Sequence, residues 1–197
     1  MSHKFNLDHA SRLDDPGRLA LFTPEIFLPH LTLPPSPVLL DIGTGTGFYL
    51  PVLSRLAGPQ GMVWAVDAQP DAVRLATRKV GEAGLSNVEV IGSEEGSLPL
   101  PDHSVDFALL AFVFHELEQP GALFTDLGRV LRPGGTVGIA DWNRQDRDKG
   151  PPPAEIPDLG ATRDLFRAHG FQEAWADTRG RYCNLFLLRR GPANPGR

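Results

Sequence analysis

The residues best suited to bind a ligand lie in one short stretch, residues 38–47. A run of Val and Leu ends there in Asp41, and glycines follow at alternate positions, as Gly43, Gly45 and Gly47. Glycine takes positive φ values and leaves no Cβ between the main chain and a ligand. Between a buried strand and a helix, such a loop offers free N–H groups and the positive end of a helix dipole. The stretch predicts a ligand-binding loop; the alternative is a tight turn in an unrelated α/β protein.

The spacing of the glycines bears on which ligand is bound. A dinucleotide-binding loop has the pattern G-x-G-x-x-G, which would place its third glycine at position 48. Position 48 is Phe, and the third glycine comes one residue earlier. The pattern D-I-G-T-G-T-G resembles motif I of the class I S-adenosylmethionine (SAM)-dependent methyltransferases, in which the glycine loop wraps the amino-acid and ribose part of SAM. The resemblance implies SAM as the cofactor, with S-adenosylhomocysteine (SAH) as its product. It implies these cofactor-binding residues in the loop: Asp41, Gly43, Thr44, Gly45 and Gly47.

A second acidic residue follows the next predicted strand. Residues 62–66 are apolar and end in Asp67, which is 20 residues after Gly47 (67 − 47 = 20). A carboxylate at this place can accept hydrogen bonds from the two vicinal hydroxyls of a ribose. We therefore expect Asp67, with the adjacent Ala68, to bind the cofactor. The alternative is that Asp67 only caps the helix that opens at Pro70.

The resemblance extends to the loop after the third predicted strand, residues 88–92. Family members commonly carry an Asp a few residues before a Leu-Pro pair, and its carboxylate meets the adenine amino group. Here Glu94 falls on that position and Glu95 on the next, before the Leu-Pro pair at 98–99. Glu is one methylene longer, and two solvated acids in a loop are the alternative. Phe112, after the fourth predicted strand, is expected to pack on the adenosine, or else to be plain core.

His115 is the candidate for a catalytic base. It lies at the carboxyl end of the fourth predicted strand, where ligands of open α/β sheets bind. Methyl transfer from a sulfonium is an in-line displacement that depends mainly on alignment, so a base is needed only if the nucleophile arrives protonated. The unperturbed pKa of histidine is about 6.5. We favour the alternative that His115 is hydrogen-bonded in the wall of the pocket. The substrate side is expected to be lined by Phe114, Asp141 and Trp142.

Strands and helices alternate along the chain, which is typical of an α/β fold. The resemblance implies a Rossmann-like, seven-stranded, mostly parallel sheet with helices on both faces and an antiparallel terminal strand. A hairpin over residues 171–177 and 182–188 would supply that strand. At 197 residues the chain is predicted to be a single domain.

Within this domain the residues before the first strand are predicted to form a helical arm. The divisions are 1–36 for the arm, 37–190 for the SAM-binding core and 191–197 for a tail. Residues 6–18 are similar to the N-terminal arm of small bacterial methyltransferases, where it covers the active site. We therefore expect a lid over the carboxyl edge of the strands, with His9 lining the substrate. The alternative is a helix that merely packs on the domain.

Charge, hydropathy and cysteine content indicate which kinds of binding partner and location to expect. The formal net charge is −5, with 19 basic and 24 acidic residues and no long basic run, so a small-molecule acceptor is favoured over nucleic acid. No apolar run approaches the ~20 residues that span a bilayer, and the first residues lack the apolar core of a signal peptide. We therefore expect a cytoplasmic protein. Cys183 is the one cysteine and the histidines lack ligand spacing, so no metal is predicted.

The run L-R-P-G-G-T at 131–136 is frequent in the same family. Within this family the chain resembles the small bacterial members of the ubiquinone and menaquinone methyltransferase branch. The resemblance is nearly silent on the acceptor, although arsenite methyltransferases need several cysteines. Two other functions stay open. One is a SAM-binding regulatory or interaction module without catalysis, and the other is a nucleotide-dependent oxidoreductase. The sequence makes no prediction about the oligomeric state.

Overall fold

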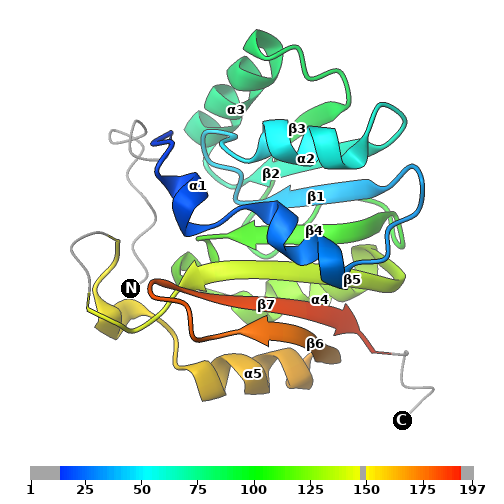
Figure 1. Cartoon of the computed structure of the whole chain (residues 1–197). Coiled ribbons are helices and arrows are strands. Elements are labelled where there is room, and N and C mark those ends of the chain that lie inside the picture. Colours follow the sequence, from blue (N-terminus) through cyan, green and yellow to red (C-terminus); the bar gives the residue numbers. More distant parts are fainter. Residues whose placement is uncertain (1–13, 147–149, 192–197) are drawn as a thin grey trace.

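The computed structural model describes residues 14–146 and 150–191 (Figure 1). Within these residues, seven strands form one sheet in the order β3-β2-β1-β4-β5-β7-β6. The strands are β1 (Val38–Ile42), β2 (Met62–Asp67), β3 (Val88–Gly92), β4 (Val105–Ala111), β5 (Leu131–Trp142), β6 (Phe171–Asp177) and β7 (Cys183–Arg190). Strands β1 to β5 are parallel, and β7 is antiparallel to both of its neighbours. The predicted Rossmann-like sheet with an antiparallel terminal strand is confirmed.

The strand order reverses beside β1. The chain runs outward from β1 to β2 and β3, then crosses back so that β4 pairs with the other side of β1. In open α/β sheets, ligands bind outside the carboxyl ends of the strands at such a switch point. The glycine loop follows β1 at this point, so the topology alone places it where a ligand would enter.

Helices cover both faces of the sheet (Figure 1). The described helices, with η marking 3₁₀ turns, are α1 (Arg18–Leu21), η2 (Pro24–His30), α2 (Leu50–Ala57), α3 (Pro70–Glu82), η3 (Phe114–Glu116), α4 (Pro120–Val130), η4 (Pro153–Glu155) and α5 (Leu159–Ala168). One buried cluster joins η2, α2 and α3 to the sheet, and the other joins α4 and α5 to the opposite face. Among the described residues, no helix combines the length and the apolar character that crossing a membrane would require.

The η2 segment packs on a face of the sheet. Phe27 is fully buried, with its ring centroid 6.1 Å from that of Phe107 and 6.0 Å from that of Trp175. A Cβ on Gly138 would lie 2.7 Å from Cε2 of Phe27, so the glycine of β5 makes the space that the ring fills. This part of the arm is core, whereas the sequence predicts a lid over the carboxyl edge. Residues 1–13, with His9, lie outside the described part of the chain.

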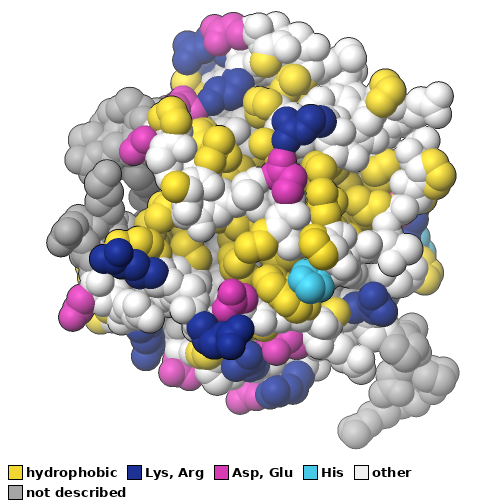
Figure 2. All heavy atoms as spheres, in the orientation of Figure 1, with side chains coloured by type: hydrophobic (Ala, Val, Ile, Leu, Met, Phe, Trp, Pro, Cys, Tyr) yellow, Lys and Arg dark blue, Asp and Glu magenta, His cyan; other side chains and the backbone are white. Residues whose placement is uncertain are grey.

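The outer side of the arm stays exposed. Leu19, Ile26 and Leu28 keep 47%, 39% and 38% of their surface in solvent. Figure 2 shows hydrophobic side chains gathered across this face of the molecule. The described part of the arm therefore buries one side only, as expected of a short segment laid over a sheet.

Three elements have distinctive starts. Strand β5 contains an irregularity near its beginning: Val105 pairs with Leu131, but Phe107 pairs with Thr136. Helix α5 begins at Leu159, where the Asp158 carboxylate accepts hydrogen bonds from the N–H groups of Gly160 and Ala161. Helix α1 begins at Arg18, and just before it the Asp15 carboxylate accepts a hydrogen bond from the Gly17 N–H, which closes a turn.

Candidate functional site

The glycine loop is held across the ends of β1 and β2. The N–H groups of Gly43 and Thr44 both donate to the Val66 carbonyl, at 2.9 and 3.1 Å. The φ angles of Gly43 and Gly45 are +67° and +57°, a region that L side chains rarely adopt. A Cβ on Gly43 would lie 2.6 Å from Cγ2 of Val113. The loop therefore requires glycine both for its backbone conformation and for its close contact with the residues after β4.

The third glycine serves the packing of the helices. A Cβ on Gly47 would lie 2.9 Å from Cδ1 of Leu50 and 3.3 Å from the Cα of Ala76. Gly47 thus lets the start of α2 approach α3, and it is not among the residues that line the cleft described below.

Asp67 connects the glycine loop to the start of α3. Its Oδ2 accepts a hydrogen bond from the Gly45 N–H at 2.8 Å, and its Oδ1 accepts one from the Gln69 N–H at 2.9 Å. Gln69 is the N-cap residue of α3, so Asp67 does order the beginning of that helix. An ionised carboxylate offers about four acceptor positions. The carboxylate can therefore accept from more than two donors.

Asp41 lies buried beneath the same loop. The Thr44 hydroxyl donates to its Oδ2 at 2.7 Å. Burial raises the pKa of Asp41 to about 7, the hydrogen bond from Thr44 opposes the rise, and the negative charge of Asp67 adds to it. A positive charge brought into this region would stabilise the ionised carboxylate and lower the pKa again.

A cleft opens at the carboxyl ends of β1, β2 and β4, and it places nearly all the predicted cofactor residues together. Nine of the ten residues predicted at the cofactor line it: Asp41, Gly43, Thr44, Gly45, Asp67, Ala68, Glu94, Glu95 and Phe112. Among the described residues, its charged lining is one cation and five carboxylates: Arg18, Asp41, Asp67, Glu94, Glu95 and Glu116. Such a lining favours a cationic ligand or one rich in hydrogen-bond donors, and it repels phosphate.

The two glutamates after β3 have different surroundings. The Glu95 carboxylate accepts hydrogen bonds from the N–H groups of Glu118 and Gln119, at 2.6 and 3.1 Å, so it caps the beginning of α4. Glu94 is exposed, and its carboxylate makes no hydrogen bond or ion pair with the described residues. Its main-chain carbonyl accepts a hydrogen bond from the Ser97 N–H at 3.1 Å. Of the two, Glu94 has the carboxylate that a ligand in the cleft could engage.

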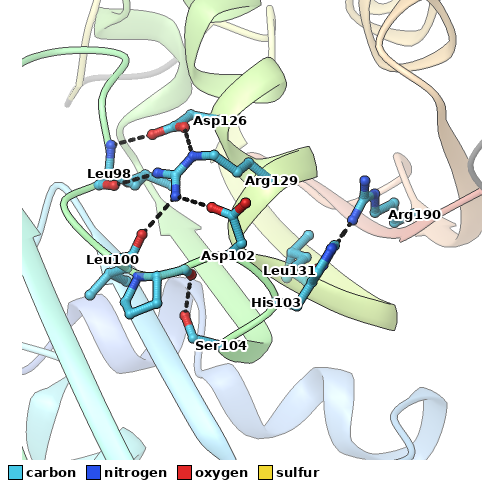
Figure 3. Close-up of polar contacts among 10 residues, drawn as sticks. Leu98, Leu100, Asp102, His103, Ser104, Asp126, Arg129, Leu131 and Arg190 are labelled. Carbon is cyan, nitrogen blue, oxygen red and sulfur yellow. Dashed lines mark hydrogen bonds and ion pairs between the residues drawn. The ribbon is translucent and has the colours of Figure 1, made fainter.

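Arg129 of α4 fixes the continuation of this loop (Figure 3). Its guanidinium donates to the carbonyls of Leu98 and Leu100, at 2.8 and 2.7 Å, and to Asp102 at 2.8 Å. It also donates to Asp126 at 2.6 Å, and Asp126 in turn accepts the Leu98 N–H at 2.5 Å. Hydrogen bonds with Asp126 and then Asp102 raise the pKa of Arg129 above its ordinary value. The network holds Leu98, which lines the cleft.

His115 and Asp141 form a buried pair between the ends of β4 and β5. His115 Nδ1 lies 2.7 Å from Asp141 Oδ1, and the His115 N–H donates to Asp141 Oδ2 at 2.8 Å. The Trp142 N–H also donates to this carboxylate, at 2.7 Å. His115 itself does not line the cleft, but its neighbours Val113 and Glu116 do. The arrangement matches a histidine hydrogen-bonded in the wall of the pocket, with its ring oriented by a carboxylate.

The aromatic residues predicted near the ligand lie in different parts of the structure. Phe112 has a φ of +62°, lines the cleft and packs on Trp142 at 4.9 Å between centroids. Neither Trp142 nor Asp141 is itself part of the described lining. Phe114 packs instead in the core on the opposite face, 6.2 Å from Phe124 and 5.9 Å from Phe166 between centroids. The expectation that Phe114 lines the substrate side is therefore corrected.

The cleft residues that sequence reasoning did not anticipate include Arg18, Phe48 and Tyr49. The guanidinium carbon of Arg18 lies over the rings of Phe48, Tyr49 and Phe112, at 5.3, 5.6 and 5.3 Å from their centroids. All four residues line the cleft. A signal for Phe48 and Tyr49 was present, because they directly follow the last glycine and open α2. Arg18 ends the segment 6–18, which was expected to cover the active site, but no role was predicted for Arg18 itself.

Comparison with known proteins agrees with this geometry. A model of the family described as "Methyltransferase domain" matches residues 40–139, which is half of the chain. The sequence is 36% identical over 107 residues to an arsenite methyltransferase of Halobacterium salinarum, covering 54% of this chain and 27% of that protein. It is 31% identical over 105 residues to a demethylmenaquinone methyltransferase of Listeria welshimeri, covering 53% of this chain and 44% of that protein. The chain thus spans less than half the length of these two relatives.

A solved structure matches over nearly the whole chain. It is described as a SAM dependent methyltransferase from Aquifex aeolicus, with 42% sequence identity and a TM-score of 0.89, and the match covers 95% of this chain and 100% of that one. The family match, the sheet order and the glycine loop at its switch point agree with one another. The chain therefore belongs to the class I SAM-dependent methyltransferases, and its cofactor is SAM.

Proposed function

We propose that the protein transfers a methyl group from SAM to a small-molecule acceptor. The main support for this proposal is the hydrogen bond from the Gly45 N–H to the Asp67 carboxylate. It brings the glycine loop together with a carboxylate suited to bind ribose hydroxyls, in a cleft lined by acidic residues. SAM has positive charge at its sulfonium and ammonium groups, and it has hydrogen-bond donors on the ribose and the adenine. The cleft, with five carboxylates among the described residues that line it, fits this set of groups.

Each acidic residue then has a separate task. Asp67 would accept from the ribose hydroxyls, because it lies at the end of β2 against the glycine loop and lines the cleft. Glu94 would accept from the adenine amino group, because its carboxylate is exposed at the rim. Asp41 would supply negative charge beneath the loop, toward the cationic amino-acid part. These assignments are supported by position in the cleft and by the resemblance to motif I.

Bound SAM supplies an electrophilic methyl group attached to sulfur. The residues of the chain would contribute mainly by holding and aligning the reactants, which is worth up to about 7–11 kcal/mol in favourable cases. A base is needed only for an acceptor that arrives protonated. The His115–Asp141 pair is the candidate, since a carboxylate orients the ring as in other general bases. His115 lies beside the cleft and is not among the residues that line it. We therefore favour a structural role for His115 in the wall of the pocket.

The negative charge of the protein and its single cysteine limit the class of methyl acceptor. A nucleic acid is disfavoured, because the net charge is −5 and the lining of the cleft is acidic. Arsenite is disfavoured as well, because soft thiolate ligands suit such a centre and the single cysteine, Cys183, is buried in β7. A small organic acceptor is the class that remains.

Titration calorimetry tests the proposal. The protein should bind SAM and SAH and give no heat with NAD at the same concentration. Incubation with SAM and candidate acceptors should then yield SAH, detected by mass spectrometry. Binding of NAD without any SAM signal would overturn the assignment. SAM binding with no SAH formed across acceptor classes would instead support a SAM-binding module without catalysis.

A further inference from the structure

Three successive residues of the glycine loop are each held by a different carboxylate. Each contact is a hydrogen bond from the loop to a carboxylate oxygen: the Thr44 hydroxyl to Asp41 at 2.7 Å, the Gly45 N–H to Asp67 at 2.8 Å and the Thr46 hydroxyl to Asp14 at 3.0 Å. Asp41 and Asp67 belong to β1 and β2, whereas Asp14 belongs to the arm. Resting on the proposed function, we propose that Asp14 is a positioning residue for SAM, which acts through Thr46 on the shape of the glycine loop.

Thr46 is the residue on which this role depends. It lies between Gly45 and Gly47, whose φ angles are +57° and +77°, and glycine has a wider choice of backbone conformations than other residues. A contact at the Thr46 side chain therefore helps to fix one conformation of the loop. Thr46 is 3% exposed and lines the cleft, so without Asp14 its hydroxyl would lose a hydrogen bond in a buried place. The loop would then shift to satisfy the hydroxyl, and the neighbouring cleft residues would shift with it.

Lys79 of α3 orients the Asp14 carboxylate. Its ammonium group forms an ion pair with Oδ1, the same oxygen that accepts from Thr46. The side chains of Lys79 and Asp14 are 27% and 43% exposed, and an ion pair with that exposure contributes little stability by itself. Its effect is geometric. Helix α3 begins just after Asp67, so the arm, the glycine loop and the helix that follows β2 meet at one carboxylate.

The same contact fixes the arm beside the cleft. Helix α1 has four residues and buries none of them, so it is too short to be stable without contacts outside itself. Phe22 supplies one such contact after the helix, since it is 3% exposed and its ring centroid lies 5.5 Å from that of Tyr49. Asp14 supplies another before the helix, and Arg18, between the two, lines the cleft. If docking of the arm on Thr46 strengthens SAM binding, SAM must strengthen that docking by the same factor.

The test measures the SAH affinity of the full chain by calorimetry, in a double-mutant cycle. Its variants are Asp14→Ala, Thr46→Val and the two changes together. Asp14→Asn and Thr46→Ser are the conservative variants, because asparagine keeps an oxygen acceptor and serine keeps the hydroxyl. Asp71→Ala is the matched control for the loss of a negative charge, since Asp71 is an exposed carboxylate of α3 that forms an ion pair with Arg74.

Asp14→Ala should weaken SAH by roughly 2- to 12-fold, the range for one net hydrogen bond. Because Asp14 acts through Thr46, adding this change to Thr46→Val should weaken SAH no further. The two conservative variants should stay within about twofold of the wild type, which is the usual error of such a cycle. Asp71→Ala should leave the affinity unchanged.

Hydrogen exchange tests the same coupling in the reverse direction. Four amide groups in and directly after α1 donate to main-chain carbonyls at 2.9, 3.1, 3.1 and 3.0 Å, those of Arg18, Leu19, Ala20 and Phe22. In the wild type, SAH should slow the exchange of these amides by up to the factor that Asp14 contributes to SAH affinity. The slowing should be smaller in Thr46→Val, because the arm no longer has its contact with the loop.

Four calorimetric results would overturn the positioning role: an Asp14→Ala affinity equal to that of the wild type, losses that add in the double variant, an equal loss in either conservative variant, or an equal loss in Asp71→Ala. Slowing of amide exchange that is the same in Thr46→Val as in the wild type would contradict it too. In each of these cases the wild type still binds SAH, so the proposed function stands. A wild-type protein that does not bind SAH is a failure of the proposed function itself, and the role of Asp14 then fails with it.

Discussion

Asp67 Oδ2 lies 2.8 Å from the Gly45 nitrogen, so the carboxylate at the end of β2 is hydrogen-bonded to the middle of the glycine loop after β1. Two features that stand 22 residues apart in sequence thereby form one wall of the cleft. The contact explains how a single carboxylate can both order the loop and face a ribose.

Replacing Asp67 tests its assignment to the ribose. Asp67→Ala should weaken SAH by roughly 1.5–3 kcal/mol, because hydrogen bonds between the hydroxyls and a charged acceptor are lost. Calorimetry measures the change. Asp71→Ala is the matched control, since Asp71 is an exposed carboxylate in the first turn of α3, the helix that follows Asp67. An affinity for SAH that stays within error of the wild type would mean that Asp67 is only a cap.

The pKa of Asp41 predicts a pH-dependent stability. It is about 7 in the folded protein against 3.8 for the ordinary group, so between these values the folded chain holds a proton that the unfolded chain has released. The free energy of unfolding should therefore fall as the pH rises from about 4 to about 7, by at most about 4 kcal/mol. Asp41→Asn keeps an acceptor for the Thr44 hydroxyl and should remove this dependence. Denaturant unfolding of both proteins across that range measures the difference, and identical profiles would contradict the assignment.

The same group should couple SAH binding to pH. The ionised form of Asp41 attracts the cationic amino-acid part, and this form dominates only above about pH 7. Affinity for SAH should rise with pH up to that value and then level, approaching a tenfold change per pH unit below it. In Asp41→Asn the slope should disappear. A wild-type affinity that is flat between pH 5 and 8 would argue against a charge interaction with Asp41.

Phe27 should prove to be a core residue although it belongs to the arm. Phe27→Ala should lower the free energy of unfolding by roughly 3–5 kcal/mol, because it empties the space that Gly138 leaves on the sheet. The adjacent Ile26→Ala, at a side chain that is 39% exposed, should cost less than about 1 kcal/mol. Removal of residues 1–30 should accordingly destabilise the sheet. If the two alanine variants lose similar amounts of unfolding free energy, Phe27 is not a core residue, and the arm would again be interpreted as a lid.

Asp141 should act on both stability and binding. Its carboxylate accepts from two backbone N–H groups and contacts the ring of His115, so Asp141→Ala should cost roughly 3–5 kcal/mol of unfolding free energy. Because Phe112, Val113 and Glu116 line the cleft, loosening of this segment should also weaken SAH. Asp177→Ala, at the more exposed end of β6, is the control. A cost below about 1 kcal/mol would show that the pair does not hold the wall.

Sequence reasoning succeeded where backbone conformation or chain order sets the outcome. The glycines specify a loop that other residues cannot form, and Asp67 ends a strand that pairs with β1, so their meeting follows from topology. His115 was predicted at the carboxyl end of a strand, and Asp141 was predicted on the substrate side. Their hydrogen bond could not be predicted, because it depends on side-chain directions in the turn after β4.

The arm was the least predictable part. Whether Phe27 covers a face or an edge of the sheet depends on the missing side chain of Gly138, more than 100 residues later in the chain. The contribution of Arg18 likewise depends on three rings from two distant segments. Local sequence patterns do not predict such contacts, because the contacts depend on tertiary packing.

A crystal structure of the complex with SAH is the most direct test of the central claim, that the cleft beneath the glycine loop is the SAM site. The account predicts the ribose hydroxyls within hydrogen-bond distance of the Asp67 carboxylate, and the nucleoside between Glu94 and Phe112. SAH bound elsewhere on the molecule, or seated in the cleft with its ribose away from Asp67, would contradict it.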